Sequence, residues 1–150
     1  SWPQLFLGLT FNYGLLLGWV SIQNEISIVP FIFYFGAIFW TLGYDTIYGF
    51  QDIKDDEIIG LKSTSIKFKN NPYNFLYLCY SIFFITLLAV GYLMSLNKYY
   101  FIFLIFIFLQ IFFFQLKKLD IKTPSSCLKI FKSNNFLGLI IYGSLILGKF

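Results

Sequence analysis

The chain has 150 residues and a net charge of +4, and 58% of its residues are hydrophobic while only 12% are charged. Soluble domains carry roughly a quarter charged residues, so this composition is typical of a membrane protein. The absence of histidine excludes a histidine general base and a Ser-His-Asp triad, and the two cysteines, Cys79 and Cys127, indicate no disulfide framework or zinc site.

Five apolar runs are candidates for transmembrane helices, which need about 20 predominantly apolar residues. The predicted helices cover residues 4–20, 28–44, 73–96, 99–116 and 135–147. Prolines lie at or near three of the expected starts, where the missing N–H group costs little. The predicted fold class is therefore an all-α membrane protein with about five transmembrane helices.

The first predicted helix carries polar and small residues that single it out. Gly14 and Gly18 form a GxxxG pair, which predicts close contact with another helix. Asn12 is open to two readings, a substrate-pocket residue or the donor of an ordinary interhelical hydrogen bond. The tryptophans are interpreted as interfacial anchors near helix ends; they are Trp2, Trp19 and Trp40.

The lysines predict how the helices are oriented in the membrane. Two segments, after the second and after the fourth helix, hold nine of the eleven: Lys54, Lys62, Lys67, Lys69, Lys117, Lys118, Lys122, Lys129 and Lys132. The positive-inside rule places these segments in the cytoplasm or the matrix. We expect an integral protein of a bacterial cytoplasmic or mitochondrial inner membrane. Nucleic acid is not expected as a partner, because the lysines lie in two loops rather than one stripe.

The negative charge is concentrated in one segment, since five of the seven acidic residues lie within residues 45–57. If the second helix continues to about residue 58, one helix face collects Asp45, Tyr48, Asp52 and either Asp55 or Asp56. Like charges at this spacing repel by about 0.2–0.5 kcal/mol per pair, so the pattern predicts a bound cation. The alternative is a solvated loop in which the nearby lysines balance the charge of the carboxylates.

Oxygen ligands without Cys or His favour a hard cation. Mg²⁺ fits best, because it commonly uses one or two carboxylates and completes its shell with water and substrate phosphate. Lys62, Ser63 and Thr64 follow the flexible Gly60 and are suited to holding a phosphate oxygen. The segment is no P-loop, since Leu61 stands where that motif needs glycine. The pattern predicts a metal and a phosphorylated ligand at a membrane face.

Three stretches of the sequence resemble a known family. WTLGYDTIYGFQDIKDDEIIGLKSTSIKF, residues 40–68, closely resembles the second aspartate-rich motif and following loop of the UbiA superfamily of intramembrane prenyltransferases. WPQLFLGLTFNYGLLLGW, residues 2–19, is similar to the preceding helix, and LDIKTPSSCLKIFKSNNFLGLII, residues 119–141, to the final loop and last helix. The resemblance covers nearly all of the chain and is strongest to the members that prenylate 4-hydroxybenzoate.

The resemblance implies a bundle of nine transmembrane helices, of which the five predicted here are the fifth to ninth. Two aspartate-rich motifs, one in each half, bind Mg²⁺ and the diphosphate of a polyprenyl donor. Asp52 and Asp56 match the DxxxD carboxylates of the second motif, and we expect them to be metal ligands and, with Lys62, catalytic residues. The expected substrate-binding residues are Asp45, Tyr48, Asp55, Lys62, Ser63, Thr64 and Asn12.

The implied reaction is transfer of the polyprenyl group from polyprenyl diphosphate to the ring of 4-hydroxybenzoate, in ubiquinone biosynthesis. The first aspartate-rich motif has no match, because the only acidic residue before Asp45 is Glu25. Residues 1–150 are therefore expected to be the C-terminal part of such an enzyme and to need a missing N-terminal half. The alternatives are another aromatic prenyltransferase of the superfamily, an inactive fragment, and a cation channel or transporter.

Overall fold

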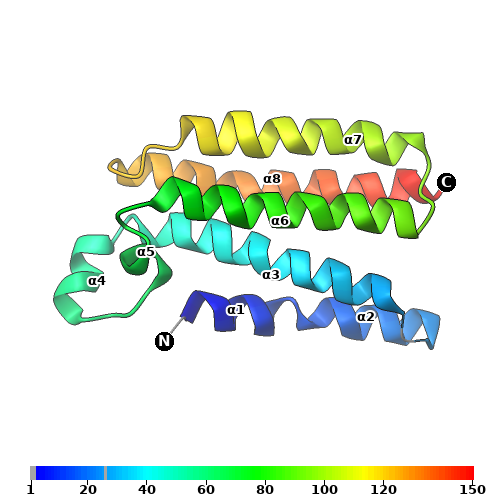
Figure 1. The fold of residues 1–150 in the computed structure, drawn as a ribbon, viewed down its shortest axis with the longest axis horizontal. Helices are drawn as coiled ribbons and strands as arrows, with labels where there is room; N and C mark the ends of the chain where they lie inside the picture. The colour runs from blue at the N-terminus through cyan, green and yellow to red at the C-terminus, as the bar shows by residue number, and fades with distance from the viewer. Residues whose placement is uncertain (1–2, 26) are drawn as a thin grey trace.

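The computed structural model describes residues 3–25 and 27–150, and the described part consists of helices and short connections (Figure 1). Trp2 lies outside these residues. Five helical segments are long and apolar enough to cross a membrane, which confirms the predicted number and the all-α class. The elements are α1 (Pro3–Phe11), α2 (Tyr13–Gln23), α3 (Ile28–Gly49), α4 (Ile53–Ile59), α5 (Thr64–Lys67), α6 (Pro72–Leu93), α7 (Lys98–Phe108), the π-helix η1 (Leu109–Leu116) and α8 (Pro124–Lys149).

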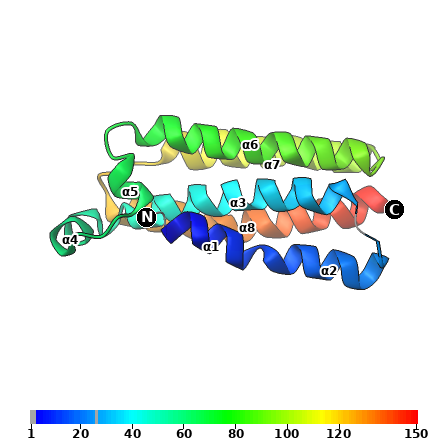
Figure 2. The ribbon, with the colours of Figure 1, turned by 60° about the horizontal axis from the view of Figure 1, so that its bottom comes forward.

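The spans are α1 with α2, α3, α6, α7 with η1, and α8. α3 packs on both α6 and α8, α7 packs on α8, and α1 and α2 lie along α3 at the outside of the bundle (Figures 1 and 2). α4, α5 and the connection to α8 gather at one end of the bundle, and the α2–α3 and α6–α7 connections lie at the other (Figure 1). Both lysine-rich segments therefore share one end.

Local signals in the sequence set several helix ends. Pro72 and Pro124 stand in the first turns of α6 and α8, where a missing N–H group leaves no bond unmade. Asn97 caps α7, since its side chain accepts the N–H of Tyr99 at 2.9 Å. Gly60 ends α4 with φ at 76°, a left-handed conformation that glycine adopts without strain.

The second predicted helix is shorter than the acidic-face hypothesis requires. α3 ends at Gly49, not near residue 58, and α4 begins anew at Ile53. α5 packs closely against the end of α3, since a Cβ at Gly49 would collide with the side chain of Ser65. The expectation of one continuous acidic helix face is wrong.

The last helix, by contrast, is longer than predicted, because it begins at Pro124 rather than near residue 135. Its first turns carry Lys129 and Lys132, which charge counting assigns to a loop. Lysine has a good helix propensity, and its long side chain can reach the membrane surface from a helix. A helix can thus start outside the apolar run that marks its crossing.

The core of the bundle is aromatic and aliphatic, with Tyr80, Phe83 and Ile107 among its fully buried side chains. Trp40 belongs to this interior. Its ring stacks on Phe83 with centroids 5.1 Å apart and an interplanar angle of 7°, and its indole N–H donates to Asn134 at 2.8 Å. These contacts join α3 to α6 and α8, and the interpretation of Trp40 as an interfacial anchor stays a prediction.

The first span is interrupted at Asn12, between α1 and α2. The Asn12 amide donates to the carbonyl of Gly8 at 2.8 Å and across to Thr41 of α3 at 2.8 Å. Of the two readings of Asn12, the interhelical hydrogen bond is the one observed. Within the described residues, the GxxxG pair does not make the predicted close contact with another helix, because a Cβ added at Gly14 or Gly18 would meet nothing within 4 Å.

Candidate active site

The candidate site lies at the lysine-rich end of the bundle, where α4 and α5 follow α3 (Figure 1). α5 is fastened to α3 by side chains: the hydroxyls of Thr46 and Thr64 are 2.6 Å apart, and Ser65 donates to the carbonyl of Thr46 at 2.9 Å. The backbone N–H of Thr64 also donates to Gln4 of α1 at 3.1 Å. These bonds hold the ends of the acidic segment while α4 projects outward.

Within that segment, Asp52 and Asp56 occupy one turn of helix. Asp52 precedes the first residue of α4, and the N–H of Asp56 donates to its carbonyl at 2.9 Å. Residues four apart share a helix face, so the local structure brings the two DxxxD positions together. Asp52 is exposed and Asp56 half-buried. Their side chains are thus open to an incoming ligand.

Asp45 and Tyr48 lie apart from this turn, on α3 before the chain breaks. Asp45 is half-buried and Tyr48 is exposed. The Tyr48 ring contacts Phe131 of α8, with centroids 4.8 Å apart. The structure therefore separates the YDTxY element from the DxxxD turn, although both belong to the same end of the bundle.

A hollow of about 620 Å³ adjoins the DxxxD turn and brings both signs of charge together. Asp52 and Asp55 line it with ammonium groups from three segments of the chain; the lysines are Lys54, Lys69 and Lys122. Carboxylate oxygens suit a hard divalent cation, and lysine suits phosphate oxygens. This set of donors fits a metal diphosphate, a ligand that carries both charges.

The carboxylates do not form a complete metal site by themselves. Within residues 3–25 and 27–150, no group of three or more Asp, Glu or Cys side chains is placed to hold a metal ion. Asp56 and Lys62 do not line the hollow. The DxxxD turn can supply two carboxylates, and Mg²⁺ commonly takes its other ligands from water and phosphate. The two carboxylates therefore fit part of the coordination shell of Mg²⁺.

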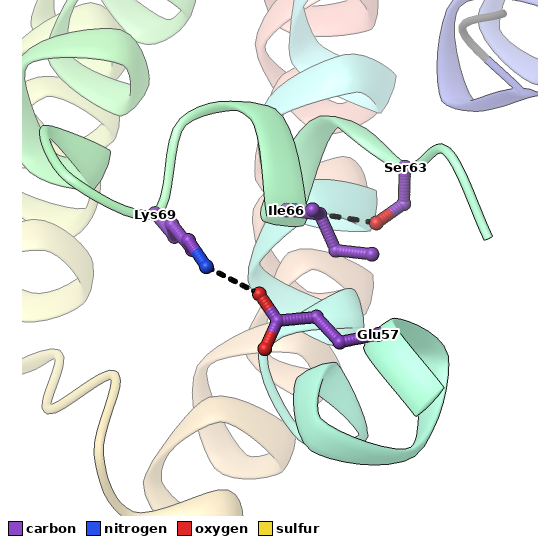
Figure 3. Close-up of polar contacts among 4 residues, drawn as sticks. All are labelled: Glu57, Ser63, Ile66 and Lys69. Atoms are coloured by element: carbon purple, nitrogen blue, oxygen red, sulfur yellow. Dashed lines mark hydrogen bonds and ion pairs between the residues drawn. The ribbon is translucent and has the colours of Figure 1, made fainter. Parts of the chain in front are cut away.

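The predicted phosphate-binding trio is divided by the fold. Lys62 is exposed and free to meet a ligand from solution. Ser63 and Thr64 are only 7% and 1% exposed. Ser63 caps α5 by accepting the N–H of Ile66 at 3.3 Å (Figure 3), and Thr64 is bonded to Thr46 as described above. Both hydroxyls thus serve the fold, and a role in phosphate binding stays a prediction.

Two surface contacts shape the rim of the hollow. Lys69 reaches from the segment after α5 to Glu57 of α4 and forms an ion pair (Figure 3). In the connection before α8, Asp120 accepts the hydroxyl of Thr123 at 2.6 Å and the N–H of Lys122 at 3.0 Å. These donors lower the pKa of the Asp120 carboxyl below its ordinary value of 3.8. The turn that presents Lys122 is thereby fixed.

A line of aromatic rings leads from this end into the bundle. Phe131 contacts Tyr44 as well as Tyr48, and Trp40 meets Tyr44 edge to face, with centroids 5.8 Å apart for each of these two pairs. Trp40 continues the line to Phe83. Aromatic faces attract cations, so the wall between α3 and α8 can stabilise positive charge that develops beside it.

Sequence reasoning missed a polar cluster inside the bundle. Trp40 and Gln115 both donate to the side-chain oxygen of Asn134, at 2.8 and 3.3 Å. Gln115 is fully buried in η1, and its carbonyl oxygen has no hydrogen-bond partner among the residues that the structure describes. Polar groups at membrane depth are costly. The sequence signal that could have predicted this cluster is the presence of an Asn and a Gln within apolar runs.

The sequence profile of the UbiA prenyltransferase family matches residues 1–140 of the chain. The chain belongs to the UbiA prenyltransferase family. It is 41% identical to a mitochondrial 4-hydroxybenzoate polyprenyltransferase of Bos taurus, over 98% of this chain and 40% of that protein. It is 34% identical to a 4-hydroxybenzoate octaprenyltransferase of Francisella tularensis subspecies novicida, over 93% of this chain and 49% of that protein.

The chain thus spans less than half the length of these relatives. No solved structure matches it. Membership of the family confirms the resemblance drawn from the acidic segment, and both relatives carry names that state prenyl transfer to 4-hydroxybenzoate.

Proposed function

We propose that this chain forms part of an enzyme that transfers a polyprenyl group from its diphosphate to the ring of 4-hydroxybenzoate, in ubiquinone biosynthesis. The single observation that carries the proposal is the DxxxD turn beside a lysine-lined hollow, at the end of an aromatic wall. The names of the two relatives supply the substrates. We place the site on the cytoplasmic or matrix side, where the lysines accumulate.

Asp52 and Asp56 would hold a Mg²⁺ ion. When bound, that ion supplies positive charge that favours departure of the diphosphate. Lys54, Lys69 and Lys122, which line the hollow, bind phosphate oxygens by charge and by N–H donation. Lys62, exposed after α4, is assigned to the same leaving group, and Asp55 adds a third carboxylate at the rim.

The remaining chemistry belongs to the membrane interior. Departure of diphosphate leaves an allylic carbocation, which the electron-rich ring of 4-hydroxybenzoate attacks ortho to its hydroxyl group. The released diphosphate then takes the proton from that ring carbon, which restores the aromatic ring. The rings of Tyr48, Phe131 and Tyr44 stabilise the cation by cation–π attraction. An apolar surrounding also keeps out the water that would compete for it.

We further propose that a second membrane segment completes the site. The described residues provide too few clustered carboxylates for a full metal shell. The span formed by α1 and α2 is also barely covered, because only 6% of the residues in its most apolar 18-residue stretch are buried. The first aspartate-rich motif, on helices that pack beside this span, would supply the missing carboxylates and cover the exposed span. An inactive fragment is the rival account, and the following experiment separates the two.

The test is prenyl transfer in membranes supplied with labelled 4-hydroxybenzoate, polyprenyl diphosphate and Mg²⁺. One sample holds this chain alone, a second holds the remaining region of the bovine relative alone, and a third holds both. We expect product only from the third sample. Product from this chain alone would refute the need for a second segment. No product from the pair, with both parts inserted and the intact bovine enzyme active, would refute the proposed function.

A further inference from the structure

A second charged hollow, distinct from the candidate active site, lies on the seam between η1 and α8. It measures about 390 Å³, and Lys118, Ser125, Ser126 and Lys129 surround an apolar floor of Phe114 and Ile130. None of these residues lines the hollow beside the DxxxD turn. In the described part of the chain, neither Lys118 nor Lys129 has a carboxylate within ion-pair distance. Their positive charge is therefore available to an outside anion.

The charged hollow continues into an apolar trough on the same seam. The trough measures about 510 Å³, and Phe114 lines both hollows. The other lining residues, from α7, η1 and α8, are Phe103, Phe106, Leu109, Gln110, Phe136 and Ile140. A ligand that fills both must have an anionic end and an apolar body.

The dimensions of the seam match one leaflet of a bilayer. From Lys129 to Ile140, α8 advances eleven residues, which is roughly 16 Å at 1.5 Å per residue. The hydrocarbon core of a bilayer is about 30 Å thick, so the trough reaches close to its midplane. The length corresponds to an ordinary acyl chain in the leaflet next to the lysines.

The polar groups along the seam also lie at the depths that such a lipid needs. Ser125 and Ser126 stand in the first turn of α8, where the helix dipole favours an anion. Lys118 also lies above the ring of Phe114, 5.1 Å from its centre, at the junction of the two hollows. Gln110 is one helical turn deeper than Phe114, roughly 6 Å, where its amide can donate to an ester carbonyl.

We propose that the seam between η1 and α8 binds an anionic phospholipid of the lysine-side leaflet. Its phosphate contacts Lys118 and Lys129, and one acyl chain lies in the trough along Phe106 and Phe136. The lysine-rich face of a membrane protein meets anionic lipid headgroups, each lysine contributing about 1 kcal/mol. The proposal is independent of the proposed transferase function, because it uses none of the residues assigned to that site.

The test uses the whole chain, purified in mild detergent with phosphatidylglycerol and phosphatidylcholine, and native mass spectrometry to count the lipids that stay bound. The variant is the double substitution Lys118→Gln/Lys129→Gln. The matched control is Lys98→Gln/Lys149→Gln, which removes the same charge at the opposite end of the bundle. We expect the wild type and the control to retain phosphatidylglycerol over phosphatidylcholine, and the variant to bind it roughly 30-fold more weakly.

A third variant, Ile140→Trp, fills the trough and leaves both lysines in place, so we expect it also to lose phosphatidylglycerol. Equal retention by the wild type and by Lys118→Gln/Lys129→Gln would overturn the proposal, and so would equal loss in the two lysine pairs. The phosphate could instead come from a free diphosphate. Release of the lipid by inorganic pyrophosphate at low concentration would assign the seam to that ligand and overturn the lipid proposal.

Discussion

The first and second membrane spans differ sharply in how they are packed, although both are apolar and of nearly equal length. In the most apolar 18-residue stretch of each span, 6% of the residues are buried for the span from Pro3 to Gln23 and 39% for α3. α3 touches α6 and α8 along its length, and the first span touches mainly α3. Apolar composition therefore indicates that a helix crosses the membrane and not that it lies in a protein core.

Small residues explain much of this difference. Gly36 and Gly43 of α3 face Thr86 and Tyr80 of α6, and an added Cβ at Gly43 would come within 3.1 Å of the Tyr80 ring. Helices pack closely in membranes where such residues let the backbones approach. Gly14 and Gly18 have the same chemistry, but in the described part of the chain an added Cβ at either would have no neighbour within 4 Å. A glycine pattern marks a contact only when a partner is present.

The largest effect on stability is expected from Gly36→Ala. Its methyl group would collide with the Thr86 side chain, and overpacking of this kind costs about 1–3 kcal/mol. Gly18→Ala is the matched control and should cause no loss. The measurement is unfolding in sodium dodecyl sulfate, followed by circular dichroism. Equal stability of the two variants would contradict the difference between the spans.

A smaller loss is expected from Asn134→Leu, which removes the acceptor that Trp40 and Gln115 share. Two donors would then be buried without a partner, and we expect the free energy of unfolding to fall by about 1–2 kcal/mol. Asn135→Leu, the next residue on α8 and an exposed one, is the control. If both variants unfold alike, the polar cluster contributes nothing to the packing of α3 on α8.

Asn12→Leu should have a weaker and local effect. It removes the side-chain bond to Thr41 that joins the first span to α3, and interhelical bonds in membranes average about 0.6 kcal/mol. We expect faster amide exchange in α1 and α2 and unchanged exchange in α6 and α8. Hydrogen exchange read by mass spectrometry checks this. Faster exchange throughout the bundle would show that the first span is not a separable layer.

The smallest effect concerns pH and lies outside the membrane. Hydrogen bonds to Asp120 lower its pKa in the folded state, so its ionised form stabilises the turn before α8. This contribution is complete above the unfolded pKa, near 3.8, and disappears as the pH falls through the lower folded value. Asp120→Asn should reduce the acid sensitivity of the turn between pH 5 and 2, measured by amide exchange at Lys122. An unchanged profile would contradict this assignment.

The sequence was sufficient for the features that depend on composition or local spacing. The five spans follow from apolar runs, and the adjacency of Asp52 and Asp56 follows from a four-residue step along a helix. The resemblance of the acidic segment to the UbiA family was equally local, and the profile match supports it.

Features that depend on distant contacts could not be predicted. Gly49, at the end of α3, packs against Ser65, which is sixteen positions away in the chain. Ser63 and Thr64 follow a glycine, which indicates an exposed loop. In the structure they are buried at the start of α5. The sequence around Trp40 does not indicate its contact with another helix, where its N–H donates to Asn134.

The central claim is that the DxxxD turn supplies the metal-binding carboxylates of a prenyltransferase. It is tested most directly by the rate of prenyl transfer in the two-part sample, with Asp52→Asn and Asp56→Asn compared against Glu25→Gln at the opposite end of the bundle. We predict losses on the order of 100-fold or more for each aspartate variant, partly recovered at high Mg²⁺, and an unchanged rate for Glu25→Gln. Full activity of both aspartate variants would contradict the account.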